Sequence, residues 1–414
     1  MSIRRLEEKD LATLSARLWT NAFPGEGIGG EAIEARKDFA NLIINKLPEF
    51  NLYGKFDEDR LCGALVLTDY TVNLHSAAKT TMGGLRALSV DLLHKKEQIA
   101  LELMQFACNH YRENGACCVA LYPFQTDFYR KMGFGYGTTL REYEIAPQSI
   151  PNYRSKAHLV YWENNHEKKA ILDCYQRVVD KNHGMFHKLG PDIYKLFGPE
   201  TRVVAYQRSG KVEGYLHFSF KVTPERQNRL LIHEMIYETP DAFQELCTFL
   251  HTQADQFAAI VFLTQDEYLH YNFTNPAHSF RSSCHPENIP FCIASVGMMY
   301  RIIDVKRYFE ILGNYNFNNQ TCRLKIQIND SLFAPNHGST VIHFTEGLAT
   351  FSDAPQFDTE ITLDVANFSS LAMGAVDFRT LLHYGLASIS QPNAAETVAR
   401  IFRFPDKPVC STFF

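Results

Sequence analysis

The sequence of 414 residues lacks the features of a membrane or exported protein. No apolar run approaches the roughly 18 residues that a membrane-spanning helix needs. Residues 1–14 are charged and contain no apolar stretch of the kind found in signal peptides. None of the ten cysteines forms a C-x-x-C pair, so a zinc site is not indicated. We expect a cytoplasmic protein with reduced thiols.

Basic residues are also in short supply. Lys and Arg number 41 against 46 Asp and Glu, which gives a formal net charge of −5. A surface that follows nucleic-acid phosphates needs a basic excess or a basic stripe. No run of Lys and Arg here is longer than two residues. The charge balance therefore argues against nucleic acid and is compatible with an amine-bearing substrate.

The periodicity of the first third predicts a mixed α/β sheet. At roughly 100–200 residues per domain, the length of the chain predicts two to four domains. The expected elements are helices over 4–23 and 31–47, strands over 51–56, 61–74 and 82–90, a helix over 95–111 and a strand over 116–122. The last strand is nearly all apolar, as expected for a strand covered on both faces of its sheet.

The same order of elements recurs further along the chain. Gly63 and Gly214 each begin a comparable long strand, and a strand over 229–237 follows the second. A helix over 241–257 and a strand over 258–264 then match the last two elements of the first copy. We predict a topological repeat whose copies are linked by residues 146–155, which contain two prolines and no periodicity.

From Met298 onward the pattern changes to that of an α+β domain. A helix is expected over 300–312, followed by alternating strands between Cys322 and Val365 and by short helices over 368–373 and 377–384. We therefore expect three domains, over residues 1–150, 151–297 and 298–414.

The junction between the third strand and the following helix has the features of an anion site. A helix N-terminus exposes unpaired N–H groups and a partial positive charge, where a pyrophosphate can bind. Lys95 and Lys96 stand in the predicted first turn, where cations oppose the dipole unless an anion compensates. The alternative is a solvated face with Asp91 as a simple cap. The equivalent helix of the second copy begins Thr239-Pro240-Asp241, which suits a helix and not a phosphate.

A segment rich in aromatic residues and glycine, Asp127–Gly137, follows the buried strand. The first of its two tyrosines, Tyr129, precedes the pattern Gly-x-Gly-x-Gly. A phenol with a pKa near 10 keeps its proton at neutral pH, so it can serve as the general acid that donates a proton to a leaving thiolate. The alternative is an aromatic packing turn, since the chain contains 20 tyrosines.

The chain ends with apolar and aromatic residues. Chain ends usually fray, whereas this composition favours burial. A buried terminus takes its α-carboxylate with it, and an unpaired buried charge is costly. A substrate ammonium would serve as the partner of that carboxylate.

Together these three features resemble the enhanced intracellular survival family of GNAT acetyltransferases. Residues 88–100 resemble the acetyl-CoA motif of the family, and residues 129–137 resemble its Ile-Tyr-Gly-Arg-Phe-Gly-Tyr-Gly segment. The final Phe-COO⁻ matches as well. The resemblance covers essentially the whole chain. It implies two tandem GNAT-like domains with mixed α/β sheets, followed by a sterol-carrier-protein-like α+β domain.

The resemblance also implies an activity, acetyl-CoA-dependent N-acetyl transfer. Its acceptor would be the primary amine of a small molecule, such as an aminoglycoside or a polyamine, or a lysine side chain. Tyr129 would be the general acid, and the carboxylate of Phe414 would act as base or orient the amine. The implied cofactor-binding residues are Leu88 and Val90 for the pantetheine and Lys95, Lys96, Gln98, Ile99 and Ala100 for the pyrophosphate. A homo-oligomer such as a hexamer is implied, with neither nucleic acid nor membrane as partner.

The acetyl-CoA motif departs from the family pattern Arg-Arg-x-Gly-x-Gly/Ala. Gln98 replaces a glycine that lets the backbone approach phosphate closely, and Glu97 adds a negative charge beside it. These changes leave open a second function, that of a catalytically impaired GNAT-like module that binds a small molecule or lipid or serves in assembly. The sequence does not separate a protein-lysine acetyltransferase from a small-molecule one.

Overall fold

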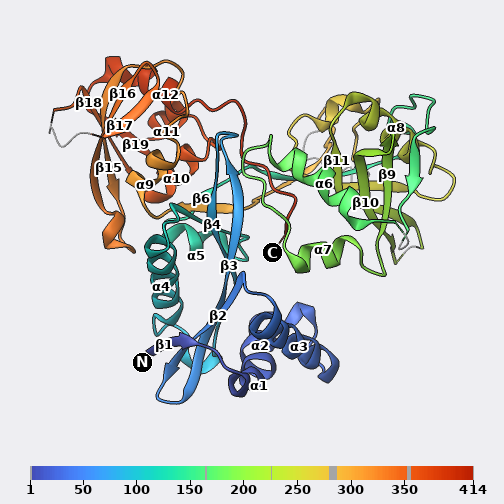
Figure 1. Cartoon of the computed structure of the whole chain (residues 1–414), viewed down its shortest axis with the longest axis horizontal. Coiled ribbons are helices and arrows are strands. Elements are labelled where there is room, and N and C mark those ends of the chain that lie inside the picture. The colour runs from blue at the N-terminus through green and yellow to red at the C-terminus, as the bar shows by residue number, and fades with distance from the viewer. Residues whose placement is uncertain (1, 164–165, 225, 279–286, 352–355, 414) are drawn as a thin grey trace. The chain divides into compact units, whose positions relative to one another are not determined.

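The computed structural model describes residues 2–413 except 164–165, 225, 279–286 and 352–355 (Figure 1). It contains two compact units. The first unit comprises residues up to 137 together with 298–407, and the second comprises 138–297 together with 408–413. The predicted class, mixed α/β with an α+β C-terminal part, is confirmed.

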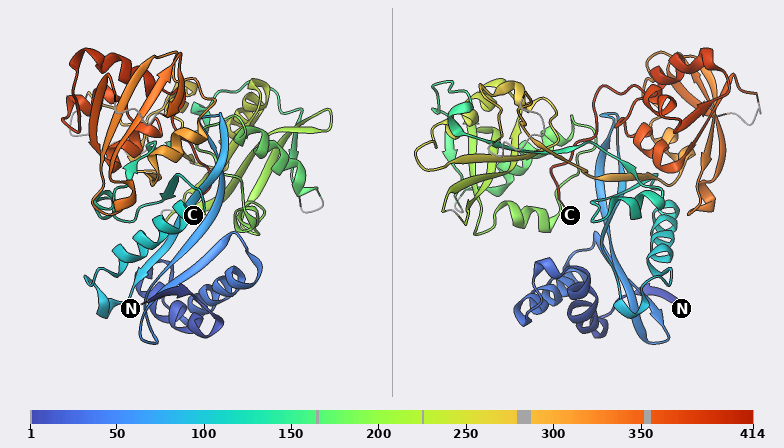
Figure 2. Two further views of the ribbon diagram at one scale, coloured as in Figure 1. Left: turned by 60° about the vertical axis from the view of Figure 1, so that its left-hand side comes forward. Right: turned by 180° about the vertical axis from the view of Figure 1, so that it is seen from behind.

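The first unit is built around a seven-stranded sheet with the order β1-β2-β3-β4-β5-β14-β6. Its strands are β1 (Ser2–Arg5), β2 (Phe50–Asp57), β3 (Arg60–Leu74), β4 (Ala78–Val90), β5 (Cys118–Leu121), β6 (Gly135–Tyr136) and β14 (Met299–Ile302). The long hairpin of β3 and β4 forms its centre (Figure 2). The pairing of β4 with β5 is parallel, and the other pairings are antiparallel.

Helices cover the two faces of this first sheet (Figure 1). One face carries α4 (Ile99–Glu113), which buries Ile99, Leu103 and Ala107. The other carries η1 (Glu8–Asp10), α1 (Leu11–Thr13), the π-helical η2 (Leu14–Trp19), α2 (Thr20–Ala22), η3 (Pro24–Glu26) and α3 (Gly30–Lys46). The first half of this unit also contains η4 (Leu92–His94) and α5 (Thr126–Lys131).

The prediction of a helix from Arg4 was wrong at its start. Arg4 and Arg5 belong to β1, where they pair with Gly54 and Tyr53 of β2. The gain from adding a strand at the sheet edge overrides the local helical pattern. The helical segment begins only at Glu8.

A second seven-stranded sheet forms the second unit, with the order β13-β7-β12-β11-β10-β9-β8. Its strands are β7 (Leu140–Ile145), β8 (Leu159–Tyr161), β9 (Arg202–Arg208), β10 (Lys211–Val222), β11 (Asn228–Tyr237), β12 (Ala259–Thr264) and β13 (Ile293–Ser295). Its helical elements are η5 (Pro147–Ser149), α6 (Lys168–Val179), α7 (Gly190–Leu196), α8 (Pro240–His251) and η6 (Leu269–Asn272).

The predicted repeat is confirmed by the topology of the two sheets. Strands β2 to β5 and β9 to β12 each give two antiparallel pairings followed by a parallel one. Gly63 and Gly214 have the same role in the two copies. A Cβ on Gly63 would lie 2.5 Å from Ile99 Cγ2, and a Cβ on Gly214 would lie 3.0 Å from Ala242 Cβ. These glycines let the first turn of the following helix approach the sheet.

The C-terminal part of the first unit contains the third sheet, with the order β17-β16-β15-β18-β19. Its strands are β15 (Cys322–Asn329), β16 (Gly338–Thr345), β17 (Leu348–Phe351), β18 (Thr359–Asp364) and β19 (Ala387–Ile389). Its helical elements are α9 (Val305–Ile311), η7 (Ala334–Asn336), α10 (Val365–Ala372), α11 (Phe378–His383), η8 (Pro392–Ala394) and α12 (Ala395–Ile401).

The helix expected over 300–312 was wrong in its first half. Residues up to Ile302 form β14, which lies between β5 and β6 of the first sheet. The helix begins after Asp304, whose side chain accepts a hydrogen bond from the backbone N–H of Arg307 at 2.9 Å. Among the described residues, no helix has the length and apolarity needed to cross a membrane.

Candidate active site

Strands β4 and β5 separate soon after they meet. Their parallel pairing is confined to Gly83 with Val119 and Gly84 with Ala120. Beyond Gly84, β4 continues to Val90 paired with β3 alone in the described part of the chain. One edge of β4 over residues 85–90 therefore presents backbone N–H and C=O groups to which an extended ligand can bind as an added strand.

A β-bulge marks this open edge. Ala64 pairs with Ser89 and Val66 pairs with Arg86, so Ala87 and Leu88 together oppose Leu65. Ala87 has a φ of +49°. Bulges bend a strand and re-aim its backbone groups, and they are frequent beside active sites. Leu88 and Val90, the predicted pantetheine contacts, are half-buried residues at and just beyond this bulge.

The loop from Asp91 to Gln98 connects β4 to α4. The Asp91 carboxylate is buried, accepts a hydrogen bond from Leu93 N–H at 2.9 Å and pairs with Arg17. Lys96 and Gln98 have φ values of +69° and +60°, in the left-handed region that favours glycine. Gln98 thus keeps a backbone conformation suited to the glycine that the family pattern places there.

The start of α4 differs from the prediction. The helix begins at Ile99, because left-handed Gln98 cannot be part of it. Lys95 and Lys96 therefore lie in the exposed loop before the helix, and not in its first turn. The Gln98 side chain caps no N–H group, so the first turn at Ile99 and Ala100 keeps backbone donors for a ligand. The Glu97 carboxylate lies 2.8 Å from His94 Nδ1.

The matching junction of the second unit is closed by its own side chains. Thr239 accepts a hydrogen bond from Ala242 N–H at 3.2 Å, and Pro240 occupies the first turn of α8. A capped N-terminus has fewer free donors for an anion. The contrast between α4 and α8 favours the first unit as the place for a phosphorylated ligand.

Tyr129 lies on α5, directly after β5. Its ring is 4% exposed and contacts Phe124, Phe128 and Phe134 edge-on at centroid distances of 5.1–5.9 Å. Burial raises the pKa of Tyr129 well above its ordinary value. The phenol is therefore protonated at neutral pH, as a proton donor must be. An aromatic packing role and a catalytic one are both compatible with this geometry.

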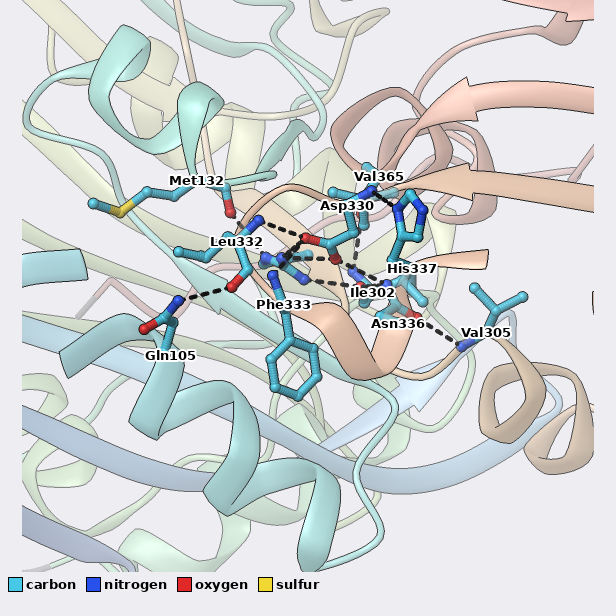
Figure 3. Close-up of polar contacts among 12 residues, drawn as sticks. Gln105, Met132, Ile302, Val305, Asp330, Leu332, Phe333, Asn336, His337 and Val365 are labelled. Atoms are coloured by element: carbon cyan, nitrogen blue, oxygen red, sulfur yellow. Dashed lines mark hydrogen bonds and ion pairs between the residues drawn. The ribbon is translucent and has the colours of Figure 1, made fainter. Parts of the chain in front are cut away.

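The turn after Tyr129 is held by a buried ion pair (Figure 3). Arg301 of β14 donates to both carboxylate oxygens of Asp330 at 2.7 and 2.8 Å and, through Nε, to the carbonyl of Met132 at 2.8 Å. Asp330 also accepts from the N–H groups of Leu332 and Phe333 at 3.1 and 2.9 Å. Both charged side chains are fully buried.

The loop that contains Asp330, Leu332 and Phe333 also connects the C-terminal domain to α4. Gln105 of α4 donates to the carbonyl of Leu332 at 3.0 Å (Figure 3). Leu332 and Phe333 belong to the apolar core under α4. The C-terminal domain therefore completes the core of the first sheet and supports both elements of the candidate site.

The glycines after Tyr129 serve close packing. Gly133 has a φ of +84°, and a Cβ on it would lie 2.6 Å from Val365 Cγ1. A Cβ on Gly135 would lie 2.1 Å from the Ala366 carbonyl oxygen. The Gly-x-Gly-x-Gly pattern thus lets α10 and β14 approach this segment.

The tail is buried within the second unit, as its composition predicted. Pro408, Cys410 and Thr412 are buried, and Val409 N–H donates to the His183 carbonyl at 2.9 Å. Phe414, the predicted source of a catalytic carboxylate, lies outside the described residues.

Four charged residues of structural weight were missed by sequence reasoning: Lys188, Glu234, Arg301 and Asp330. Glu234 and Arg301 interrupt the apolar strands β11 and β14. A charge inside an apolar strand signals a buried ion pair, because an unpaired one is costly. That signal could have identified both residues, although their partners are distant in sequence.

Comparison with known proteins defines the class. Residues 2–137 match an acetyltransferase (GNAT) domain, residues 179–302 match a second acetyltransferase (GNAT) domain, and residues 308–411 match a sterol carrier protein domain. With two GNAT domains, the chain is an N-acetyltransferase. No curated protein sequence matches it.

Three solved structures share the fold over the whole chain. A GCN5-related N-acetyltransferase from Anabaena variabilis is 17% identical, with a TM-score of 0.83 and 100% of both chains covered. A probable N-acyltransferase of unknown function from Enterococcus faecalis is 18% identical, with a TM-score of 0.78 and coverage of 100% and 99%. Eis1 from Mycobacterium abscessus is 16% identical, with a TM-score of 0.77 and 100% of both chains covered.

Proposed function

We propose that the chain transfers the acetyl group of acetyl-CoA to a primary amine, using the first GNAT domain. One observation carries the proposal: the open edge of β4 is connected by the loop of residues 91–98 to the uncapped start of α4. An extended pantetheine arm fits the edge, and a pyrophosphate fits the exposed N–H groups beyond it. Lys95 and Lys96, exposed in the intervening loop, supply cations for the phosphates.

The residues of the motif fit this ligand despite their departures from the family pattern. The left-handed φ of Gln98 gives the loop the shape that a glycine would give. Glu97 is tied to His94. Val90, Gln98, Ile99 and Ala100 would donate backbone N–H groups, and Leu88 would offer backbone groups at the bulge.

In the proposed mechanism a neutral amine attacks the thioester carbonyl, so a C–N bond forms and the C–S bond breaks. The backbone of β4 near Leu88 and Val90 holds the carbonyl oxygen. Tyr129 donates its proton to the departing sulfur and is reprotonated from solvent. The carboxylate of Phe414 orients the amine and passes its proton to water, because an unperturbed α-carboxylate with a pKa near 3.3–3.7 is a weak base.

The test is a thiol-release assay with acetyl-CoA and a panel of polyamines, aminoglycosides and lysine peptides. We expect acetyl-CoA-dependent turnover with at least one amine and saturable binding of acetyl-CoA by calorimetry. Absence of binding at millimolar acetyl-CoA would contradict the proposal and favour a binding or assembly module.

A second experiment tests the role of the terminus. Adding one glycine after Phe414 moves the carboxylate by about 3.5 Å along an extended chain. We expect this extension, and deletion of Phe414, to lower kcat by about 100-fold while acetyl-CoA binding is retained. An extended chain with full turnover would contradict the role of the carboxylate.

We further propose kinship with the enhanced intracellular survival family. The arrangement of two GNAT domains followed by a sterol carrier protein domain supports it, as does the fold shared with Eis1. The expected homo-oligomer is tested by light scattering of the purified chain.

A further inference from the structure

The last described residues of the chain form an extended segment within the second unit. Pro408, Cys410 and Thr412 are buried, whereas the residue after each of them is half-buried. An alternation with a period of two is typical of an extended peptide that lies with one side against a protein surface. Residues 405–407 are exposed, so the buried segment begins at Pro408. We call the place that residues 408–413 occupy the seat of the tail.

The backbone of this segment has hydrogen-bond partners at three consecutive residues. Thr138 Oγ1 donates to the Pro408 carbonyl at 2.5 Å, Val409 N–H donates to the His183 carbonyl at 2.9 Å, and Cys410 N–H donates to Gln265 Oε1 at 2.6 Å. Gly184 has a φ of +84° and permits the close approach, because a Cβ on it would lie 2.7 Å from Pro408 Cβ. Buried backbone groups need such partners, so the second unit holds the segment in one defined register.

A buried polar cluster lies beneath the next residue of the tail, Ser411. Glu234 of β11 pairs with Lys188 at 2.9 Å and accepts hydrogen bonds from Tyr215 and from the Ser411 hydroxyl. The Tyr175 hydroxyl lies 3.5 Å from Ser411 Oγ. The seat of the tail therefore recognises a side chain of the segment as well as its backbone.

The charges of this cluster persist in the interior. Burial would lower the pKa of Lys188, but the Glu234 carboxylate outweighs it and the pKa is raised. Burial would raise the pKa of Glu234, but Lys188 and its hydrogen-bond donors lower it. The ion pair therefore stays ionised, and an ionised carboxylate accepts a stronger hydrogen bond from Ser411 than a neutral acid would.

The seat of the tail lies where two strands of the second sheet part. His217 pairs with Glu234 and Phe218 pairs with Ile232, so His233 forms a bulge in β11. β11 stays paired with β12 only before this bulge. Glu234 follows the bulge on β11, and Gln265 follows the end of β12. In the first sheet the matching place is the open edge of β4 beyond its own bulge.

The start of α8 is poorly suited to a phosphate. Thr239 accepts a hydrogen bond from Ala242 N–H, and Pro240, which has no N–H, occupies the first turn. The second copy thus offers few free donors for an anion and many partners for a peptide. Both differences from the first copy point to a change of ligand.

We infer that the second GNAT domain is a peptide-binding domain whose ligand is residues 408–413 of its own chain, held where β11 and β12 part. The ligand it takes is an extended peptide with a small side chain at the buried position of Cys410 and a hydroxyl at the position of Ser411. This role concerns the second unit alone and is independent of acetyl transfer by the first GNAT domain.

The test uses the full chain with a protease recognition sequence inserted between Asp406 and Lys407, in the exposed stretch before the seat of the tail. The chain folds with its tail in place and is then cut, so a failure to fold without the tail cannot be mistaken for a failure to bind. Dialysis removes the released tail. The probe is a synthetic peptide of residues 405–413 with fluorescein at its N-terminal end and an amide at its C-terminal end, and fluorescence anisotropy follows its binding.

We expect saturable one-to-one binding of the probe to the cut chain. The uncut chain is the matched control, because it has the same sequence with the tail attached. An attached segment competes at an effective concentration of about millimolar, so the probe should bind the uncut chain at least about tenfold more weakly.

Peptide variants test the individual contacts. Ser411→Ala removes the hydroxyl that donates to Glu234 and should weaken binding by about tenfold. Ser411→Thr retains a hydroxyl and should bind within about threefold of the unchanged peptide. Cys410→Arg places a charge at a buried position and should abolish binding.

Absence of saturable binding to the cut chain would overturn the inference, and so would equal affinity of the cut and uncut chains. Equal affinity of the Ser411→Ala and unchanged peptides would overturn the recognition of Ser411 by Glu234. Displacement of the probe by acetyl-CoA would assign the place to a cofactor and would overturn the inference as well.

Discussion

Replacing Gln98 by glycine tests the conformation of the loop that leads into α4. Gln98 has a φ of +60° and makes no capping hydrogen bond. A side chain in the left-handed region costs roughly 1–2 kcal/mol, and a glycine there avoids this cost. Against this gain, glycine makes the unfolded chain more flexible, which costs about 0.4–1 kcal/mol.

The two terms leave a net stabilisation of about 1 kcal/mol for Gln98→Gly. For units of this size, that corresponds to a rise in Tm of about 2–4 °C. Asparagine tolerates the left-handed region better than most residues, so Gln98→Asn should fall between glycine and wild type. Gln98→Ala keeps a Cβ at the same φ and should give no comparable gain.

The assay is calorimetric unfolding of the four proteins, together with titration of acetyl-CoA. Gln125→Gly is the matched control, because Gln125 also precedes a helix without capping it but has an extended φ of −140°. The difference between the two glycine variants isolates the left-handed contribution. Because the loop already has the required shape, the Kd of acetyl-CoA should change by less than about threefold.

The reasoning is refuted if Gln98→Gly is no more stable than Gln98→Ala. A gain in acetyl-CoA affinity of tenfold or more would show instead that the Gln98 side chain obstructs the ligand.

Three further predictions follow from buried groups. Asp330→Asn leaves Arg301 buried with a neutral partner, so the free energy of unfolding of the first unit should fall by about 3–5 kcal/mol. A calorimetric Tm within about 2 °C of wild type would contradict the role assigned to this pair. Tyr129→Phe should lower kcat by about 100-fold or more with little change in KM for acetyl-CoA. Tyr136→Phe, at a more exposed neighbouring position, should leave kcat unchanged. Equal activity of the two variants would leave Tyr129 as a packing residue. Burial lowers the pKa of His217 to about 4, so the unfolded chain takes up that proton first as the pH falls. The resulting stability is fully present above about pH 6.5 and is lost towards pH 4, by up to about 3 kcal/mol, and His217→Phe should flatten this part of a stability-against-pH curve measured by urea unfolding.

Much of the first sheet could be predicted because its elements are local and periodic. The apolar face of α4 and the strands around Gly63 carry patterns that tertiary contacts reinforce. The exchange that places β14 in the first sheet and β7 in the second could not be predicted. The pairings of β14 cover four and two residues and those of β7 cover five and three, and such short pairings between distant segments leave no periodic trace in the sequence. The start of α4 was missed for a different reason: a left-handed glutamine has no sequence signature.

The candidate site also has a part that could be predicted from the sequence and a part that could not. The order of β4, loop and α4 is readable from the sequence, and so is the burial of the tail. The place of Met132 depends on Arg301 and Asp330, which are 169 and 198 positions further along the chain. The seat of the tail depends equally on Glu234 and Gln265, whose roles appear only when β11 and β12 are seen to part.

Amide hydrogen exchange with and without acetyl-CoA tests the central claim most directly, because it reports which GNAT domain takes the ligand. The account predicts slower exchange at residues 88–90 and 98–101, and unchanged exchange at 233–242 of the second domain. Unchanged exchange at the first of these segments, or protection confined to the second domain, would contradict it.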